Sequence, residues 1–104
     1  TLADVNIRGV AQRLIEKRLR RNSENLKQLQ NELTLLDEQL DALRDDANDK
    51  EMRSLVSETP LALHEYRDAQ KHVEALLEHR DFLLRSIAEQ TRNQDELLDR
   101  LGKS

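Results

Sequence analysis

Three histidines and an aspartate in the second half of the chain have the spacing of residues that share one side of a helix. His64, Asp68 and His72 are four residues apart, and His79 follows at the heptad position of His72. Two ligands four residues apart on a helix can share a metal ion. His64 and His72 would nevertheless lie about 12 Å apart along the axis, too far to share one. We therefore predict exposed side chains with helix-stabilising Asp–His pairs, and no metal site.

Basic residues form a cluster near the N-terminus. Residues 1–30 carry a net charge of +4, whereas residues 31–58 carry −6. Such a cluster could bind phosphates of nucleic acid or another anionic surface. The alternative is a solvated face that pairs with Asp95, Glu96 and Asp99. The net charge of the chain is −4 and no aromatic residue interleaves the cluster to stack on bases. The cluster comprises Arg13, Lys17, Arg18, Arg20 and Arg21.

The sequence contains no arrangement of residues that indicates catalysis, and two helices enclose no rigid pocket. The chain has no cysteine, which excludes disulfides, thiol catalysis and cysteine-based metal sites. Its two glycines, Gly9 and Gly102, make no phosphate-binding loop, and no Ser/His/Asp arrangement stands on a defined scaffold. We expect no enzyme activity and no cofactor.

The elements that position these residues follow from a heptad pattern. Charged and apolar residues each make up 37% of the chain, a composition typical of coiled coils. In the first half, the distance from one apolar residue to the next is alternately three and four residues, which predicts a helix over about 6–47. The basic cluster would face outward on this helix. The seam residues are Ile15, Leu19, Leu26, Leu29, Leu33, Leu36, Leu40, Leu43 and Ala47, with Gln12 and Asn22 at polar seam positions.

A second helix is predicted over about 60–101. Thr59 is a good N-cap, Pro60 suits the first helical position, and Gly102 is a plausible stop. The seam contains Ala62, Tyr66, Ala69, Val73, Leu76, Arg80, Leu83, Ile87, Gln90, Gln94, Leu97 and Leu101. Beside this seam, Leu77, Leu84 and Leu98 widen the apolar stripe.

The segment 48–59 is predicted to be a short helical or irregular corner, because mild helix breakers precede it. Two helices joined by a short connection pack antiparallel, so the fold class is an all-α coiled-coil hairpin in one domain spanning 1–104. Met52, Leu55 and Val56 lie in the corner. They are expected to cap the end of the hairpin; the alternative is that they form an exposed docking site.

The antiparallel arrangement also predicts which polar seam residues meet. Gln12 is expected near Gln94, and Asn22 near residues 83–87, within one turn of Gln90. Polar seam residues at matched heights can fix the register. The alternative is that they face solvent. Arg80, at a seam position, either pairs with Glu24 or Glu32 across the hairpin or extends its head into solvent while its stem packs on the seam.

These features favour a non-catalytic protein–protein interaction or scaffolding module. A two-helix hairpin buries only one seam per helix, so the wider stripes indicate a second contact surface. We expect a homodimer that forms a four-helix bundle; another helical protein is the alternative. A nucleic-acid-associated regulatory protein is the second hypothesis. Because the sequence starts at Thr1, the third is a spacer arm of a longer protein. We expect a cytoplasmic location and no membrane partner.

The second half of the chain carries a weak sequence resemblance. The stretch 53–70, Arg-Ser-Leu-Val-Ser-Glu-Thr-Pro-Leu-Ala-Leu-His-Glu-Tyr-Arg-Asp-Ala-Gln, resembles short actinobacterial coiled-coil proteins of unassigned function, as do His79-Arg80-Asp81 and the stretch 94–101. The resemblance implies a bacterial cytoplasmic protein and assigns no activity or site residue.

Overall fold

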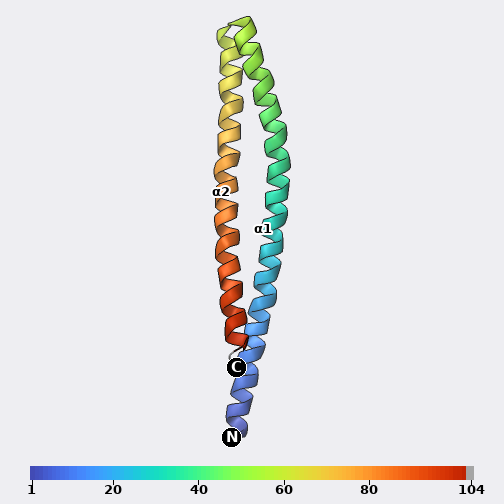
Figure 1. Ribbon diagram of the computed structural model, residues 1–104, viewed down its shortest axis with the longest axis vertical. Coiled ribbons are helices and arrows are strands. Elements are labelled where there is room, and N and C mark those ends of the chain that lie inside the picture. The colour runs from blue at the N-terminus through green and yellow to red at the C-terminus, as the bar shows by residue number, and fades with distance from the viewer. Residues whose placement is uncertain (103–104) are drawn as a thin grey trace. The chain divides into compact units, whose positions relative to one another are not determined.

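The computed structural model describes residues 1–102, and these form two long α-helices (Figure 1). Helix α1 spans Leu2–Ser57 and helix α2 spans Pro60–Gly102. None of the described residues belongs to a β-strand, which confirms the all-α class. Neither helix contains an apolar stretch that would suffice to cross a membrane, as far as the described residues reach.

Only Glu58 and Thr59 separate the two helices. The backbone N–H of Glu58 donates to the carbonyl of Ser54 at 3.2 Å, and Glu58 has a φ of 49°, which ends α1 in the left-handed region. The Thr59 hydroxyl then accepts the backbone N–H of Ala62 at 3.2 Å. The predicted N-cap at Thr59 and helix start at Pro60 are therefore confirmed.

The predicted corner over 48–59 is wrong in its extent, because α1 continues through Ser57. Lys50 pairs with Asp46 at 2.8 Å one turn earlier in the helix, and Ala47 is buried against α2. Packing of Ala47 and this local ion pair outweigh the weak helix propensity of the surrounding Asp and Asn residues. The start of α1 at Leu2 is likewise earlier than the predicted position, about residue 6.

The chain divides into two compact units, each with segments of both helices. Unit 1 comprises residues 1–31 and 85–104, and unit 2 comprises residues 32–84. Counted from the sequence, the net charge is +4 for unit 1 and −8 for unit 2. The two units therefore offer surfaces of opposite charge to any partner.

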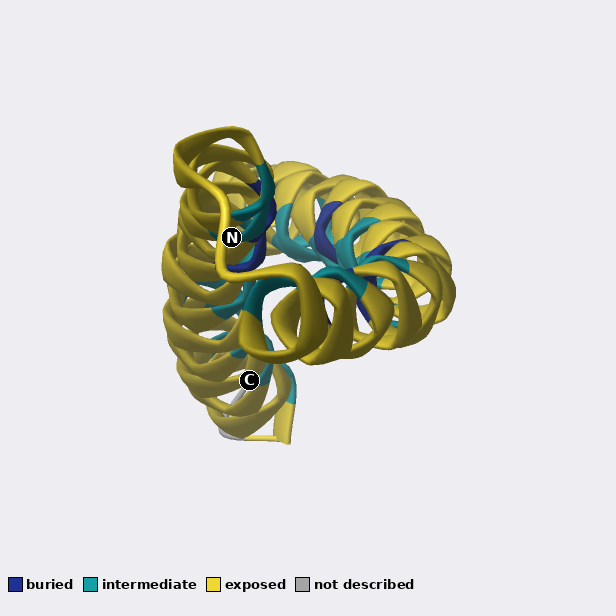
Figure 2. Cartoon of the chain, turned by 90° about the horizontal axis from the view of Figure 1, so that it is seen from above, coloured by how far each residue is buried: buried dark blue, intermediate teal, exposed yellow. Residues whose placement is uncertain are grey.

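Unit 2 is an antiparallel hairpin around a narrow apolar seam. Leu83 is its most buried side chain, with 1% of its surface exposed. Figure 2 shows that buried and half-buried residues form a strip along each helix while the rest of the surface is exposed. The core residues are those that the heptad pattern placed at the seam: Leu36, Leu40, Ala47, Ala69, Val73 and Leu83, with Leu43 and Leu76 packed beside them.

Unit 1 has a thinner core, in which Asn22 is the buried residue. Its apolar seam residues are half-buried: Ile15, Leu19, Leu26, Leu29, Ile87 and Leu97. The first turns of α1 extend beyond the end of α2 (Figure 1), so Ile7 and Val10 lack a facing helix and are 67% and 48% exposed. Unit 1 therefore depends more on polar contacts than unit 2.

The register differs from the predicted one. Gln94 was expected opposite Gln12, but it accepts a hydrogen bond from Asn22 at 2.7 Å. Asn22 lies about three helical turns further along α1. The longer α1 moves the turn toward the C-terminus, which displaces every pair of facing positions. Asn22 was expected opposite residues 83–87, within a turn of Gln90, but it donates a hydrogen bond of 2.9 Å to the carbonyl of Gln90 itself, which agrees with the same displacement.

Candidate functional site

Asn22 joins the two helix segments of unit 1. Its side-chain Nδ2 donates one hydrogen bond to the backbone carbonyl of Gln90, at 2.9 Å, and another to Oε1 of Gln94, at 2.7 Å. No buried side-chain nitrogen or oxygen among the described residues lacks a partner. Both donor hydrogens of the Asn22 amide are thus used inside the protein. The two bonds fix the position of the α1 segment along the axis of the α2 segment.

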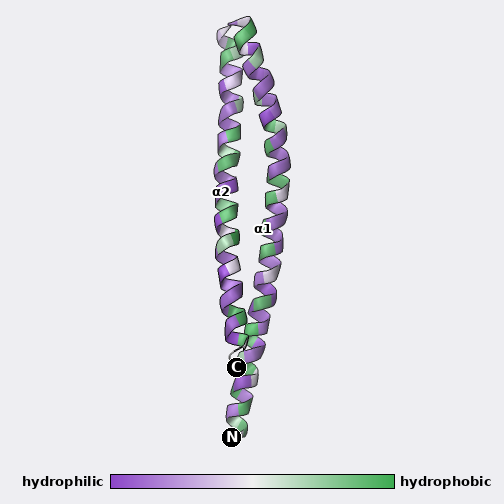
Figure 3. Cartoon of the chain, in the orientation of Figure 1, coloured by the Kyte–Doolittle hydropathy of each residue, from purple (hydrophilic) through white to green (hydrophobic). Residues whose placement is uncertain are grey.

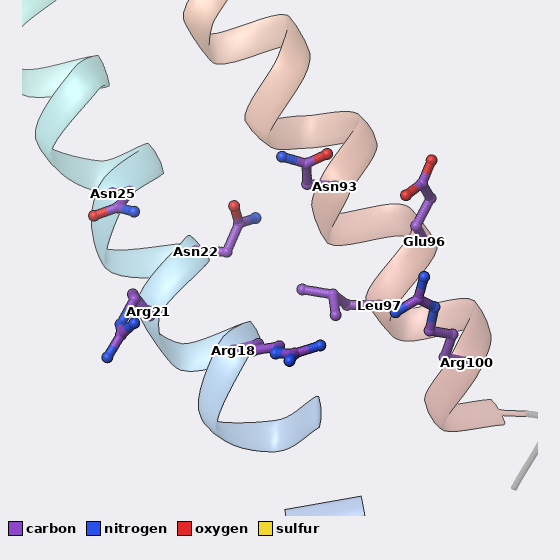
Figure 4. Close-up of a pocket in the computed structure, with 8 residues that line it drawn as sticks. All are labelled: Arg18, Arg21, Asn22, Asn25, Asn93, Glu96, Leu97 and Arg100. Atoms are coloured by element: carbon purple, nitrogen blue, oxygen red, sulfur yellow. The ribbon is translucent and has the colours of Figure 1, made fainter. Parts of the chain in front are cut away.

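A hollow of about 280 Å³ opens beside Asn22 on the surface of unit 1. In Figure 4, Arg18 extends from α1 toward α2, and Arg100 lies on the α2 side of the hollow. Leu97 contributes apolar surface between them. The lining residues are Arg18, Arg21, Asn22, Asn25, Asn93, Glu96, Leu97 and Arg100.

The basic cluster of α1 lies on the surface, as its outward heptad positions predict. Arg13, Lys17, Arg20 and Arg21 are exposed, and none of them forms an ion pair within residues 1–102. The cluster is therefore a solvated face, as the alternative had it, but the pairing of that face with Asp95, Glu96 and Asp99 is wrong. The long side chains extend from the outer face of α1 and keep their charge available to an anion.

Leucines next to the seam of α2 are only partly covered. In unit 2, Leu63, Leu77 and Leu84 share one heptad position and are 39%, 38% and 40% exposed. Leu98 of unit 1 occupies the same heptad position and is 51% exposed. Leu77, Leu84 and Leu98 are the predicted extra width of the second helix, whereas Leu63 was not predicted to belong to it. The three residues of unit 2, Leu63, Leu77 and Leu84, are called the leucine row below.

The turn of unit 2 carries a second group of exposed apolar side chains. Met52, Leu55 and Val56 are 65%, 66% and 83% exposed, and Leu61 on α2 is 67% exposed. Hydrophobic ribbon is visible on both sides of the turn in Figure 3. These side chains are therefore uncovered in the single chain, because the two-residue turn leaves no loop that could fold over them; whether they cap the end of a bundle of two copies stays a prediction.

The histidines lie on the surface of unit 2. His64 Nε2 is 3.3 Å from Asp68 Oδ2, which confirms the Asp–His pair. The ring of His79 stacks on Phe82 with centroids 6.3 Å apart and planes inclined by 12°. Within the described part of the chain, no three His, Cys, Asp or Glu residues are grouped closely enough to hold a metal ion.

Arg80 pairs with a residue that the sequence did not indicate. Its Nε donates to Asp37 Oδ1 at 2.8 Å, whereas Glu24 and Glu32 were the predicted partners. The side chains of Arg80 and Asp37 are 38% and 44% exposed. The guanidinium group therefore reaches solvent, which was the alternative to pairing across the hairpin. The corrected register explains the partner, since it places Asp37 across from Arg80.

A comparison with protein-family models, curated proteins and solved structures finds no match. The resemblance to actinobacterial coiled-coil proteins therefore stays a prediction. A function can therefore be inferred only from the surfaces described above.

Proposed function

We propose that this chain is a non-catalytic interaction module that self-associates through a helix face. The observation that carries the proposal is the leucine row on α2. In unit 2 its members repeat at heptad positions adjacent to the seam, and each keeps roughly two-fifths of its surface exposed. Gln70 occupies the same heptad position between Leu63 and Leu77, so the row is longest without a break at Leu77 and Leu84. An apolar edge next to an already packed seam is the feature by which hairpins pair into four-helix bundles.

The charge distribution supports a second copy as the partner. Unit 2 has a net charge of −8 and unit 1 a net charge of +4. The acidic unit of one copy can therefore attract the basic unit of another, and such opposite charges favour association of two copies.

The proposal is tested by removing apolar surface from the leucine row. We expect the double substitution Leu77→Gln and Leu84→Gln to convert a dimer into a monomer in sedimentation, because glutamine does not gain from burial. Leu61→Gln is the matched control, since Leu61 is an exposed leucine of the same helix outside the row. A double variant that keeps the dimer mass would contradict the proposal.

Nucleic acid is a second candidate partner, favoured by the unpaired basic cluster of unit 1. Lys17 and Arg20 lie exposed on the outer face of α1 without an ion pair among the described residues. Binding to a duplex would weaken steeply with salt, and the joint substitution of Lys17 and Arg20 by glutamine would reduce the salt dependence by about two charges. Fluorescence anisotropy with a labelled duplex measures both quantities.

A further inference from the structure

The hollow in unit 1 brings two arginines from different helices to the same side of the seam. Arg18 precedes a seam residue of α1, Leu19, and Arg100 has the corresponding place on α2 beside Leu101. Residues that flank an interhelical seam are often paired as opposite charges. Here both residues are arginines, and neither forms an ion pair within residues 1–102.

The remaining lining of the hollow adds hydrogen-bond donors and little competing charge. Asn25 and Asn93 occupy the next flanking positions and carry side-chain amide groups, while Asn22 uses its own donors inside the protein. Glu96 is the one carboxylate in the lining, and it forms no ion pair with Arg100. Three guanidinium groups, those of Arg18, Arg21 and Arg100, and the amides of Asn25 and Asn93 therefore line a space of about 280 Å³. In Figure 4, Arg21 extends away from α2, whereas Arg18 extends toward it.

We propose that this hollow binds a small phosphate dianion, held by Arg18 of α1 and Arg100 of α2. A dianion matches the net charge of +2 that the three arginines and Glu96 give the lining. Guanidinium groups bind phosphate oxygens through paired N–H donors. The lining contains no aromatic residue that would hold a base or a sugar. The ligand also bridges the two helix segments and relieves the repulsion between the arginines, so its binding stabilises the fold.

The test is the melting temperature of the full chain in sodium phosphate and in sodium chloride at equal ionic strength, followed by circular dichroism. Phosphate stabilises most proteins non-specifically, so variants and not the buffers alone decide the outcome. We expect phosphate to raise the melting temperature of the wild type by a few degrees more than that of Arg18→Gln or Arg100→Gln. In chloride, both variants should melt no lower than the wild type, because each removes one of the arginine charges that repel one another around the hollow.

Arg20→Gln is the matched control, because Arg20 is exposed on the same helix and lies outside the hollow. It should keep the full response to phosphate. Broadening of the phosphorus resonance of inorganic phosphate should follow the same order, with Arg18→Gln and Arg100→Gln abolishing it.

Glu96→Gln gives a test in the opposite direction. Removing the single carboxylate of the lining should strengthen the response to phosphate. An equal response in the wild type and all variants would overturn the proposal, and so would an equal loss in Arg20→Gln, which would indicate a general effect of positive charge. A loss of the dimer mass in Arg18→Gln would overturn it as well, since the hollow would then belong to a contact between copies.

Discussion

Asn22 and Gln94 are hydrogen bonded through their side chains, with 2.7 Å between Nδ2 and Oε1. The same Nδ2 also donates to the backbone carbonyl of Gln90, so one amide binds two successive turns of α2. A leucine at position 22 would fill the seam but could make neither bond, and a leucine at position 94 would lose the bond between the two side chains. The pair therefore selects one register of unit 1 from the several that a repeating leucine seam allows.

Replacing Asn22 by alanine should lower the free energy of unfolding by about 1–2 kcal/mol, because two hydrogen bonds are lost and Gln94 keeps a partly buried amide without this partner. Urea denaturation at fixed protein concentration measures the change. The double variant Asn22→Leu with Gln94→Leu should recover stability through apolar burial. A single variant with unchanged stability would mean that the two hydrogen bonds contribute nothing.

Glu58→Gly should stabilise the fold by about 0.5–1 kcal/mol, because glycine adopts the φ of 49° at no steric cost. The control is Glu38→Gly, in an exposed stretch of α1, which should destabilise by about 1 kcal/mol. Thermal melts should show a higher melting temperature for Glu58→Gly and a lower one for Glu38→Gly than for the wild type. If both substitutions lower the melting temperature, the left-handed turn at Glu58 is not a source of strain.

Leu83→Ala should cost about 2–4 kcal/mol, since Leu83 is 1% exposed and its loss leaves a cavity in the seam. Leu55→Ala, at a leucine that is 66% exposed, should change the free energy of unfolding by less than about 0.5 kcal/mol. Urea titrations of the two variants, measured in parallel, distinguish the stability contribution of a seam leucine from that of a surface leucine. Similar losses at both positions would show that the turn is covered in solution.

Arg80→Leu should leave stability unchanged or raise it slightly. The ion pair with Asp37 is more than a third exposed on both sides, and such pairs contribute about 0–1 kcal/mol. A leucine would continue the apolar seam. Chemical denaturation at low and high salt provides the measurement. A large loss that is confined to low salt would mean that the pair is stronger than its exposure indicates.

The seam could be predicted from the sequence because burial on a helix follows a fixed period. Leu36, Val73 and Leu83 all lie where the heptad placed them, and even the polar seam residue Asn22 is buried. The start of α2 could also be predicted from local chemistry. The Thr59 hydroxyl can accept a backbone N–H of the first turn, and Pro60 suits the first helical position because it lacks an N–H.

The length of α1 and the register could not be predicted in this way. Helix propensity treats residues 45–49 as breakers, whereas packing of Ala47 against α2 keeps them helical. An error in the position of the turn then carries over to every facing pair, which is why Asp37 was missed as the partner of Arg80. The proximity of Arg18 and Arg100 was hidden for the same reason, although both occupy the same flanking heptad position.

The most direct test of the account is the solution mass of the unmodified chain, measured by light scattering over a range of protein concentrations at low and high salt. We predict a dimer mass that persists to micromolar concentration at low salt and weakens as salt screens the opposite charges of the two units. A monomer mass at every concentration would contradict self-association, and the leucine row would then be the binding face for a different helical protein.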